Sequence, residues 1–124
     1  MSTPIASVSA SRFTASATRE GDEILVRLAG EADSNAKPRL APFLDAVHGA
    51  ATTSPGATVV VDFQSLKFMS SSCFQNFVAW LGRVREAEEA EQYRIAFLAN
   101  AEQHWQRRSL SALGCFAPDQ VVIK

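Results

Sequence analysis

The stretch GATVVVDFQSLKFMSSSCFQNFVAWL, residues 56–81, decides the fold of this protein. Its first half holds a short, continuously apolar run, which is typical of a strand buried on both faces of a parallel sheet. Its second half repeats apolar residues at the spacing of a helix, and three consecutive serines separate the two halves. The stretch therefore predicts a buried strand, a turn and an amphipathic helix. The expected apolar stripe of that helix is Phe74, Phe77, Val78, Leu81 and Val84.

The chain before this stretch predicts a hairpin and another helix. Residues 13–18 and the alternating segment EILVRLAGE, residues 23–31, are expected to pair through a turn at Gly21 and Asp22. The next apolar residues are spaced i, i+3, i+4 and i+7, as in a helix with Pro38 in its first turn that ends near Gly49. They are Leu40, Phe43, Leu44 and Val47.

The chain after this stretch continues the alternation of strands and helices. YRIAFLA, residues 93–99, and QVVI, residues 120–123, are expected strands, and residues 101–114 form a helix between them. The apolar side of that helix is expected at Trp105, Ala112 and Leu113. Because such strands need crossover connections, the class is α/β, with a mixed, mostly parallel sheet covered by helices.

Length and composition limit the function. The 124 residues suffice for one core, so we expect a flexible tail at residues 1–11 and one domain at residues 12–124. A formal net charge of −1 lacks the basic excess of a nucleic-acid-binding protein. No apolar run reaches the roughly 20 residues of a membrane span, so membrane insertion is not expected. Cys73 and Cys115 are expected as reduced thiols in a cytoplasm.

The serine triplet, Ser70 to Ser72, falls where the expected strand ends and the helix begins. Serine is a favoured N-cap, and two starts are open: Ser72 with Gln75 as a capping box, or Ser70 with Met69 and Phe74 as a hydrophobic staple. A helix N-terminus at the carboxyl edge of a sheet also suits an anion, including a phosphate on serine. Capping and a phosphorylation switch are thus both consistent with the triplet.

Residues 56–81 resemble the central block of STAS domains, the anti-sigma-factor antagonist modules of bacteria, in which a strand leads through an apolar stretch to Asp-Ser-Ser-Gly and a helix. VRLAGEADSNAKPRL, residues 26–40, and RRSLSALGCFAPDQVVI, residues 107–123, are similar to the family's flanking parts. By position, the resemblance implies a phosphorylated serine at Ser72, with Ser71 before it. Ser70 stands where the motif has Asp, and Cys73 where it has Gly.

The resemblance implies a non-enzymatic signalling module that binds a kinase-type anti-sigma factor and regulates transcription. The expected partner-binding residues are Ser70, Cys73, Asn76, Trp80 and Asp33. Because the motif's Asp is missing, a STAS scaffold or structural subunit that is never phosphorylated is the second hypothesis.

A third hypothesis is a small enzyme or redox sensor that uses Cys73 as a thiolate, with His48 or His104 as its base. The sequence has no Gly-rich phosphate loop, and two isolated histidines do not predict a metal site. No cofactor and no metal are therefore expected.

Overall fold

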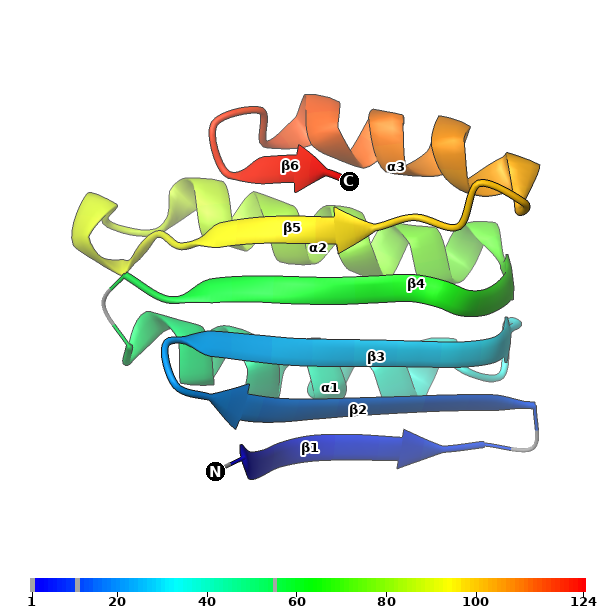
Figure 1. The fold of residues 1–124 in the computed structure, drawn as a ribbon, viewed down its shortest axis with the longest axis horizontal. Helices are drawn as coiled ribbons and strands as arrows, with labels where there is room; N and C mark the ends of the chain where they lie inside the picture. Colours follow the sequence, from blue (N-terminus) through cyan, green and yellow to red (C-terminus); the bar gives the residue numbers. More distant parts are fainter. Residues whose placement is uncertain (1, 11, 55) are drawn as a thin grey trace.

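The computed structural model describes residues 2–10, 12–54 and 56–124. Within these residues the chain forms one six-stranded sheet and three α-helices (Figure 1). The strands are β1 (Ser2–Ser9), β2 (Phe13–Glu20), β3 (Glu23–Ala32), β4 (Thr58–Met69), β5 (Arg94–Leu98) and β6 (Val121–Ile123). The helices are α1 (Lys37–Thr52), α2 (Ser71–Glu86) and α3 (His104–Phe116), with a 3-10 turn, η1, at Glu89–Glu91.

The strands lie side by side in the order in which they occur in the sequence, β1 to β6. β1, β2 and β3 pair antiparallel, and β3, β4, β5 and β6 pair parallel. The expected hairpin is present, and Gly21 supplies the positive φ of +61° that its turn requires. The α/β class and the mixed, mostly parallel sheet are confirmed.

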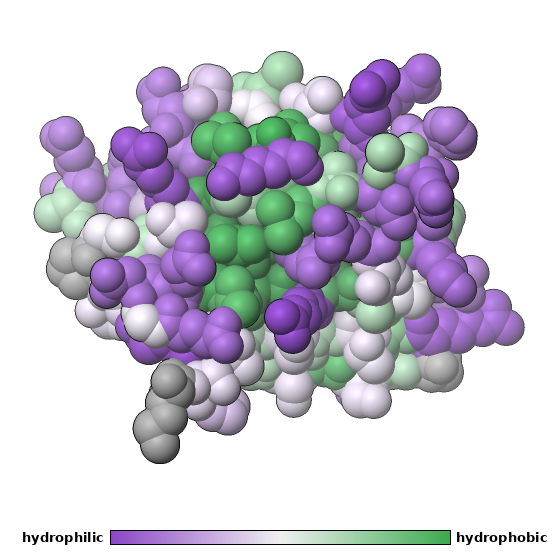
Figure 2. Space-filling view, viewed as in Figure 1, coloured by the Kyte–Doolittle hydropathy of each residue, from purple (hydrophilic) through white to green (hydrophobic). Residues whose placement is uncertain are grey.

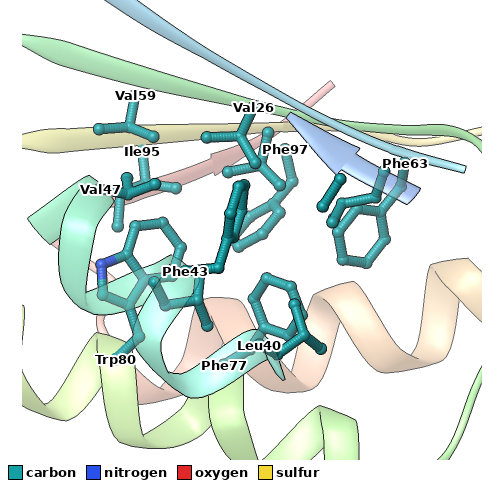
Figure 3. Packing of buried hydrophobic residues seen from close by; sticks show 14 of the residues in the cluster. Val26, Leu40, Phe43, Val47, Val59, Phe63, Phe77, Trp80, Ile95 and Phe97 are labelled. Carbon is teal, nitrogen blue, oxygen red and sulfur yellow. The ribbon is translucent and has the colours of Figure 1, made fainter. Parts of the chain in front are cut away.

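All three helices cover the same face of the sheet (Figures 1 and 3). The inward side chains of the strands meet those of the helices there, and Figure 3 shows Phe63 of β4 and Phe97 of β5 lying over Phe77 of α2. Crossovers between parallel strands are right-handed, and the strand order advances in one direction from β3 to β6. Each crossover therefore places its helix on the same side, and the core lies between one helical layer and one sheet face.

The expectation that the VVVDF strand is buried on both faces was wrong. Val59 and Val61 are buried under the helices, whereas Val60 points to the opposite face and stays half-exposed. The strand is also longer than expected, because β4 continues beyond Asp62 and pairs with β3 as far as Met69. This extra length carries the serine triplet away from the centre of the sheet.

The first residues form a strand where a flexible tail was expected. Ser2–Ser9 pairs antiparallel with β2, with a register shift between Pro4 and Ala6. Ile5, Ala6 and Val8 are partly buried against the core. The many serines and threonines concealed a strand that is stabilised by pairing with β2 and by these few apolar contacts.

The helices differ from the expected ones in their bounds and buried sides. α1 runs to Thr52, past Gly49. On α2 the most buried side includes Cys73 and Trp80, whereas Phe74 and Val78 are only partly buried. On α3 Ala112 is exposed and Trp105 partly buried, and the buried residues are Gln106, Leu110 and Leu113.

Candidate functional site

Ser70 is the N-cap of α2. Its φ of −68° and ψ of 160° are extended, and its Oγ accepts a hydrogen bond from the backbone N–H of Cys73, 3.2 Å away. The Ser70 N–H donates to the carbonyl of Ala32 at 2.8 Å, which ties the end of β4 to the end of β3. Of the two starts that the sequence left open, the structure therefore selects Ser70.

The other two serines differ in exposure and in contacts. Ser71, the first helical residue, is exposed. Ser72 is half-buried, and its Oγ lies 3.0 Å from that of Ser70. Both hydroxyls belong to the first turn of α2, where the positive end of the helix dipole favours negative charge.

Cys73 belongs to the core and not to a contact surface. Its side chain is fully buried, and its thiol donates to the carbonyl oxygen of Asp33 across 3.2 Å. Burial raises the pKa of the Cys73 thiol above its ordinary value, so the thiolate is disfavoured. The expectation that Cys73 contacts a partner was therefore wrong, because no part of its side chain reaches the surface.

Asp33 and Asn76 join the β3–α1 connection to α2. The Asp33 backbone oxygen also accepts from the Ala36 N–H at 2.9 Å, and its carboxylate Oδ1 accepts from the Asn35 N–H at 3.0 Å. Asn76 Nδ2 donates to the carbonyl oxygen of Lys37 at 3.2 Å. The structure thus brings Asp33, Ser70 and Asn76 to one end of the molecule, with all three half-exposed.

Trp80 is also in the core, with 2% of its surface exposed, so its assignment as a surface contact was wrong. Its Nε1 donates to the Tyr93 hydroxyl at 2.8 Å, and the same hydroxyl lies 2.8 Å from His48 Nδ1. Burial raises the pKa of Tyr93. Burial also lowers the pKa of His48, with a further contribution from the Arg83 guanidinium. The three side chains form a neutral polar chain inside the helical layer.

These hydrogen bonds also bear on the cysteine-enzyme hypothesis. His48 is bonded to Tyr93, while Cys73 is bonded to the Asp33 carbonyl. His104 is an exposed residue at the start of α3. The thiolate that this hypothesis needs is disfavoured, and neither histidine is hydrogen-bonded to the thiol.

An open hollow of about 360 Å³ lies beside the exposed serine. Its lining contains apolar groups together with hydroxyls and one guanidinium. The lining residues are Met69, Ser71, Phe74, Arg108, Ser109 and Ala112. Phe68, the residue before Met69 in β4, is 47% exposed. We call Phe68, Met69, Ser71, Phe74 and Arg108 the α2 docking surface.

Sequence reasoning missed Phe68, Met69 and Arg108 as surface residues of this site. Met69 was expected only in a helix staple, Phe74 was expected there or in the apolar stripe of the helix, and Arg108 lies far away in the sequence, on α3. Phe68 carried a weak signal, since a Phe next to the serine triplet has no place in the apolar stripe of the helix. Its exposure depended on the unforeseen continuation of β4.

In the part of the chain that the structure describes, no three metal-ligating side chains of His, Cys, Asp or Glu gather in one place. The helices within the described ranges are all too short or too polar to cross a membrane.

Comparison with known proteins supports the fold and not a specific activity. No family model matches the sequence, and a search of curated proteins gives no match either. Among solved structures, the chain is similar to an anti-sigma factor antagonist from Mycobacterium paratuberculosis, with a TM-score of 0.65 and 19% identity over 90% of this chain and 88% of that one. It is also similar to an uncharacterized protein with a SpoIIAA-like fold from Shewanella loihica, with a TM-score of 0.58 and 16% identity over 96% and 90% of the two chains. The sheet order, the single helical layer and these two similarities together show that the protein has a SpoIIAA-like fold.

Proposed function

We propose that this protein is a non-enzymatic, protein-binding regulatory module of the anti-sigma-factor antagonist type, acting in a bacterial cytoplasm. Its partner, a kinase-type anti-sigma factor or a related signalling protein, docks on the α2 docking surface. The observation that carries the proposal is the exposed Phe68, together with the partly buried Met69 and Phe74, beside the first turn of α2. Exposed aromatic groups next to polar groups are typical of protein contacts.

Serine phosphorylation at the start of α2 is the proposed switch. A phosphate on Ser72, or on Ser71 before it, adds nearly two negative charges at a helix N-terminus, which stabilises them. Arg108, in the lining of the same hollow as Ser71, offers a guanidinium to such a phosphate. Docking against an apolar partner surface would remove water from the charged phosphate. This removal costs free energy, so phosphorylation should weaken docking.

The second candidate is a STAS scaffold that is never phosphorylated. It is favoured by the hydrogen bonding of Ser72, a half-buried residue whose hydroxyl lies 3.0 Å from the Ser70 hydroxyl. In this case the α2 docking surface still binds a partner, and only the switch is lost.

Affinity capture with matched variants tests the docking surface. The protein is immobilised and exposed to extract from its source organism, and retained proteins are identified by mass spectrometry. Phe68→Ser should abolish retention of the specific partner, while Phe116→Ser, at a similarly exposed phenylalanine at the far end of α3, should not. If both variants retain the same proteins as the natural chain, the proposed docking surface is wrong.

The switch is tested with the captured partner. Ser72→Glu and Ser71→Glu should each weaken the partner's affinity in calorimetry, whereas Ser111→Glu, at an exposed position of α3 that does not line this hollow, controls for added charge and should not. Mass spectrometry of the peptide FMSSSCFQNF after incubation with the partner and ATP reports phosphorylation. If the peptide is not phosphorylated and the affinities do not change, the switch is rejected and the scaffold function is supported.

A further inference from the structure

The face of the sheet opposite the helices carries an apolar row. Leu25 of β3, Val60 of β4, Ala96 of β5 and Val122 of β6 are direct neighbours in the strand register. We call these four residues the open-face row. Figure 2, which views this face, shows a hydrophobic patch over the middle of the sheet, crossed on the β5 and β6 side by a hydrophilic side chain and bordered by hydrophilic residues. Val122 is 50% exposed and Leu25 and Val60 are partly buried, whereas Ala96 is only 7% exposed.

This row conflicts with the sequence pattern of β4. Val59, Val60 and Val61 form the uninterrupted apolar run that characterises strands covered on both faces. In the single chain only the Val59 and Val61 face is covered. Open faces of sheets usually alternate polar residues with the buried ones, so the pattern calls for a second layer that one chain does not contain.

Charged residues flank the row in two parallel lines. One line is Glu23, Thr58 and Arg94, and the other is Arg27, Asp62 and Leu98, again direct neighbours in the register. Glu23 and Arg27 thus lie two residues on either side of Leu25, roughly 13 Å apart along β3. Among the described residues, none of Glu23, Arg27, Asp62 and Arg94 forms an ion pair.

We infer that this face binds a second copy of the same chain and forms a two-fold symmetric dimer by sheet-on-sheet packing. A two-fold axis along the open-face row places Leu25 over Leu25 and Val60 over Val60 of the partner copy. Because Glu23 and Arg27 are equally far from Leu25, the same axis places Arg27 of each copy over Glu23 of the other. The face therefore matches itself in its apolar row and in charge, as a two-fold interface requires.

The remaining charges favour this axis over a two-fold axis that runs along β4. Along the row, Asp62 meets Thr58 of the second copy and Arg94 meets Leu98, so no like charges face each other. An axis along β4 would instead place Asp62 over Asp62, a repulsive contact at the centre. The dimer leaves α2 free, because the helical layer is on the other side of the sheet (Figure 1).

Sedimentation equilibrium of the purified protein, from about 1 µM to about 1 mM, tests the dimer. The natural chain should dimerise within this range. Arg27→Glu and Glu23→Arg should each raise the dissociation constant about tenfold or more, because each places like charges opposite one another. The double variant Glu23→Arg with Arg27→Glu should recover the natural value, since it restores both contacts with their signs exchanged.

Two controls keep the outcome clear. Arg85→Glu makes the same charge reversal at an exposed position of α2, away from the open face of the sheet, and should leave dimerisation unchanged. Val60→Lys should give a monomer, while Ala79→Lys on α2 should not, with thermal melts showing that each variant folds. The inference is overturned if the natural chain stays monomeric at the highest concentration. It is also overturned if Val60→Lys still dimerises, or if the double variant dimerises as weakly as the single variants. None of these measurements involves the partner of the α2 docking surface, so they are independent of the proposed function.

Discussion

The Ser70 hydroxyl accepts a hydrogen bond from the Cys73 N–H, and the Cys73 thiol donates to the Asp33 carbonyl. These two bonds link the cap of α2 to the connection between β3 and α1. In the STAS motif that residues 70–73 resemble, Ser70 stands in place of Asp and Cys73 in place of Gly. Both residues have structural roles in this chain: Ser70 begins the helix and Cys73 fills the core. This relationship determines how the motif can be altered in an experiment.

Ser70→Ala should lower the free energy of unfolding by about 1 kcal/mol, because the Cys73 N–H loses its acceptor. Ser70→Asp should retain most of that stability, since Asp caps helices as well as Ser does. Urea unfolding of both variants provides the measurement. Ser71→Ala, at the exposed position beside the cap, is the matched control and should change stability little. Equal losses in the Ser70→Ala and Ser71→Ala variants would show that the cap contributes nothing.

Restoring the Asp of the motif should be possible without restoring its Gly. Cys73→Gly removes a fully buried side chain and places glycine in the first turn of a helix, so it should cost about 2 kcal/mol. Ser70→Asp alone keeps the core intact and is the better version for testing phosphoryl transfer from ATP by the captured partner. Urea unfolding checks the stability difference, and a Cys73→Gly variant as stable as the natural chain would contradict the packing role of Cys73.

The two thiols should differ in reactivity. Cys115 is exposed, whereas Cys73 is buried and the pKa of its thiol is raised. An aromatic disulfide reagent at neutral pH should modify one thiol quickly in the native protein and the second only after denaturation. In Cys115→Ser the fast phase should disappear. A fast phase that persists in this variant would place a reactive thiolate at Cys73 and revive the enzyme hypothesis.

Gln106 should be a sensitive position of the core. It is fully buried, and its Nε2 donates to the carbonyl oxygens of Phe63 and Leu66 at 2.7 and 2.9 Å. Its Oε1 also accepts from the Asn100 N–H at 2.8 Å. Gln106→Leu removes all three bonds and should lower the free energy of unfolding by about 3 kcal/mol. Gln75→Leu, at an exposed site on α2, is the control for the same replacement, and thermal or urea unfolding compares the two. Similar stabilities for the two variants would contradict this role of Gln106.

Stability should fall as the pH drops just below 6.5. The pKa of His48 is lowered from its ordinary 6.5 in the folded state, first by burial and then by the Arg83 guanidinium. Between the lowered and the ordinary values the unfolded chain binds more protons, so acidification favours unfolding there, and stability is regained as the pH rises to 6.5. Urea unfolding at a series of pH values should show this slope.

His48→Gln is the informative variant for that slope, because a glutamine side chain can still hydrogen-bond with the Tyr93 hydroxyl but does not titrate. The slope just below pH 6.5 should flatten in His48→Gln and persist in the control His104→Gln, which removes an exposed histidine. A slope that is unchanged in His48→Gln would assign it to other groups.

The sequence by itself determined the fold class and the order of the elements from residue 13 onward. The run from Val59 to Val61, the helical spacing of Phe77, Leu81 and Val84, and the turn at Gly21 are local patterns that dictate a strand, a helix and a hairpin. Strands and helices that alternate in this way can form only a largely parallel sheet with crossovers. The location of the serine triplet at the start of α2 followed from the same patterns.

Only the tertiary structure decided which residues reach the surface. Periodicity cannot tell Cys73 and Trp80 from Phe74 and Val78, because the two pairs lie on adjoining sides of one helix and α1, α3 and the sheet determine which side is covered. The strand at Ser2–Ser9 is stabilised by pairing with β2, and its own residues barely indicate it. The open-face row likewise exists because every crossover places its helix on one side of the sheet. Burial depends on contacts between segments that are far apart in the chain, and no local pattern contains that information.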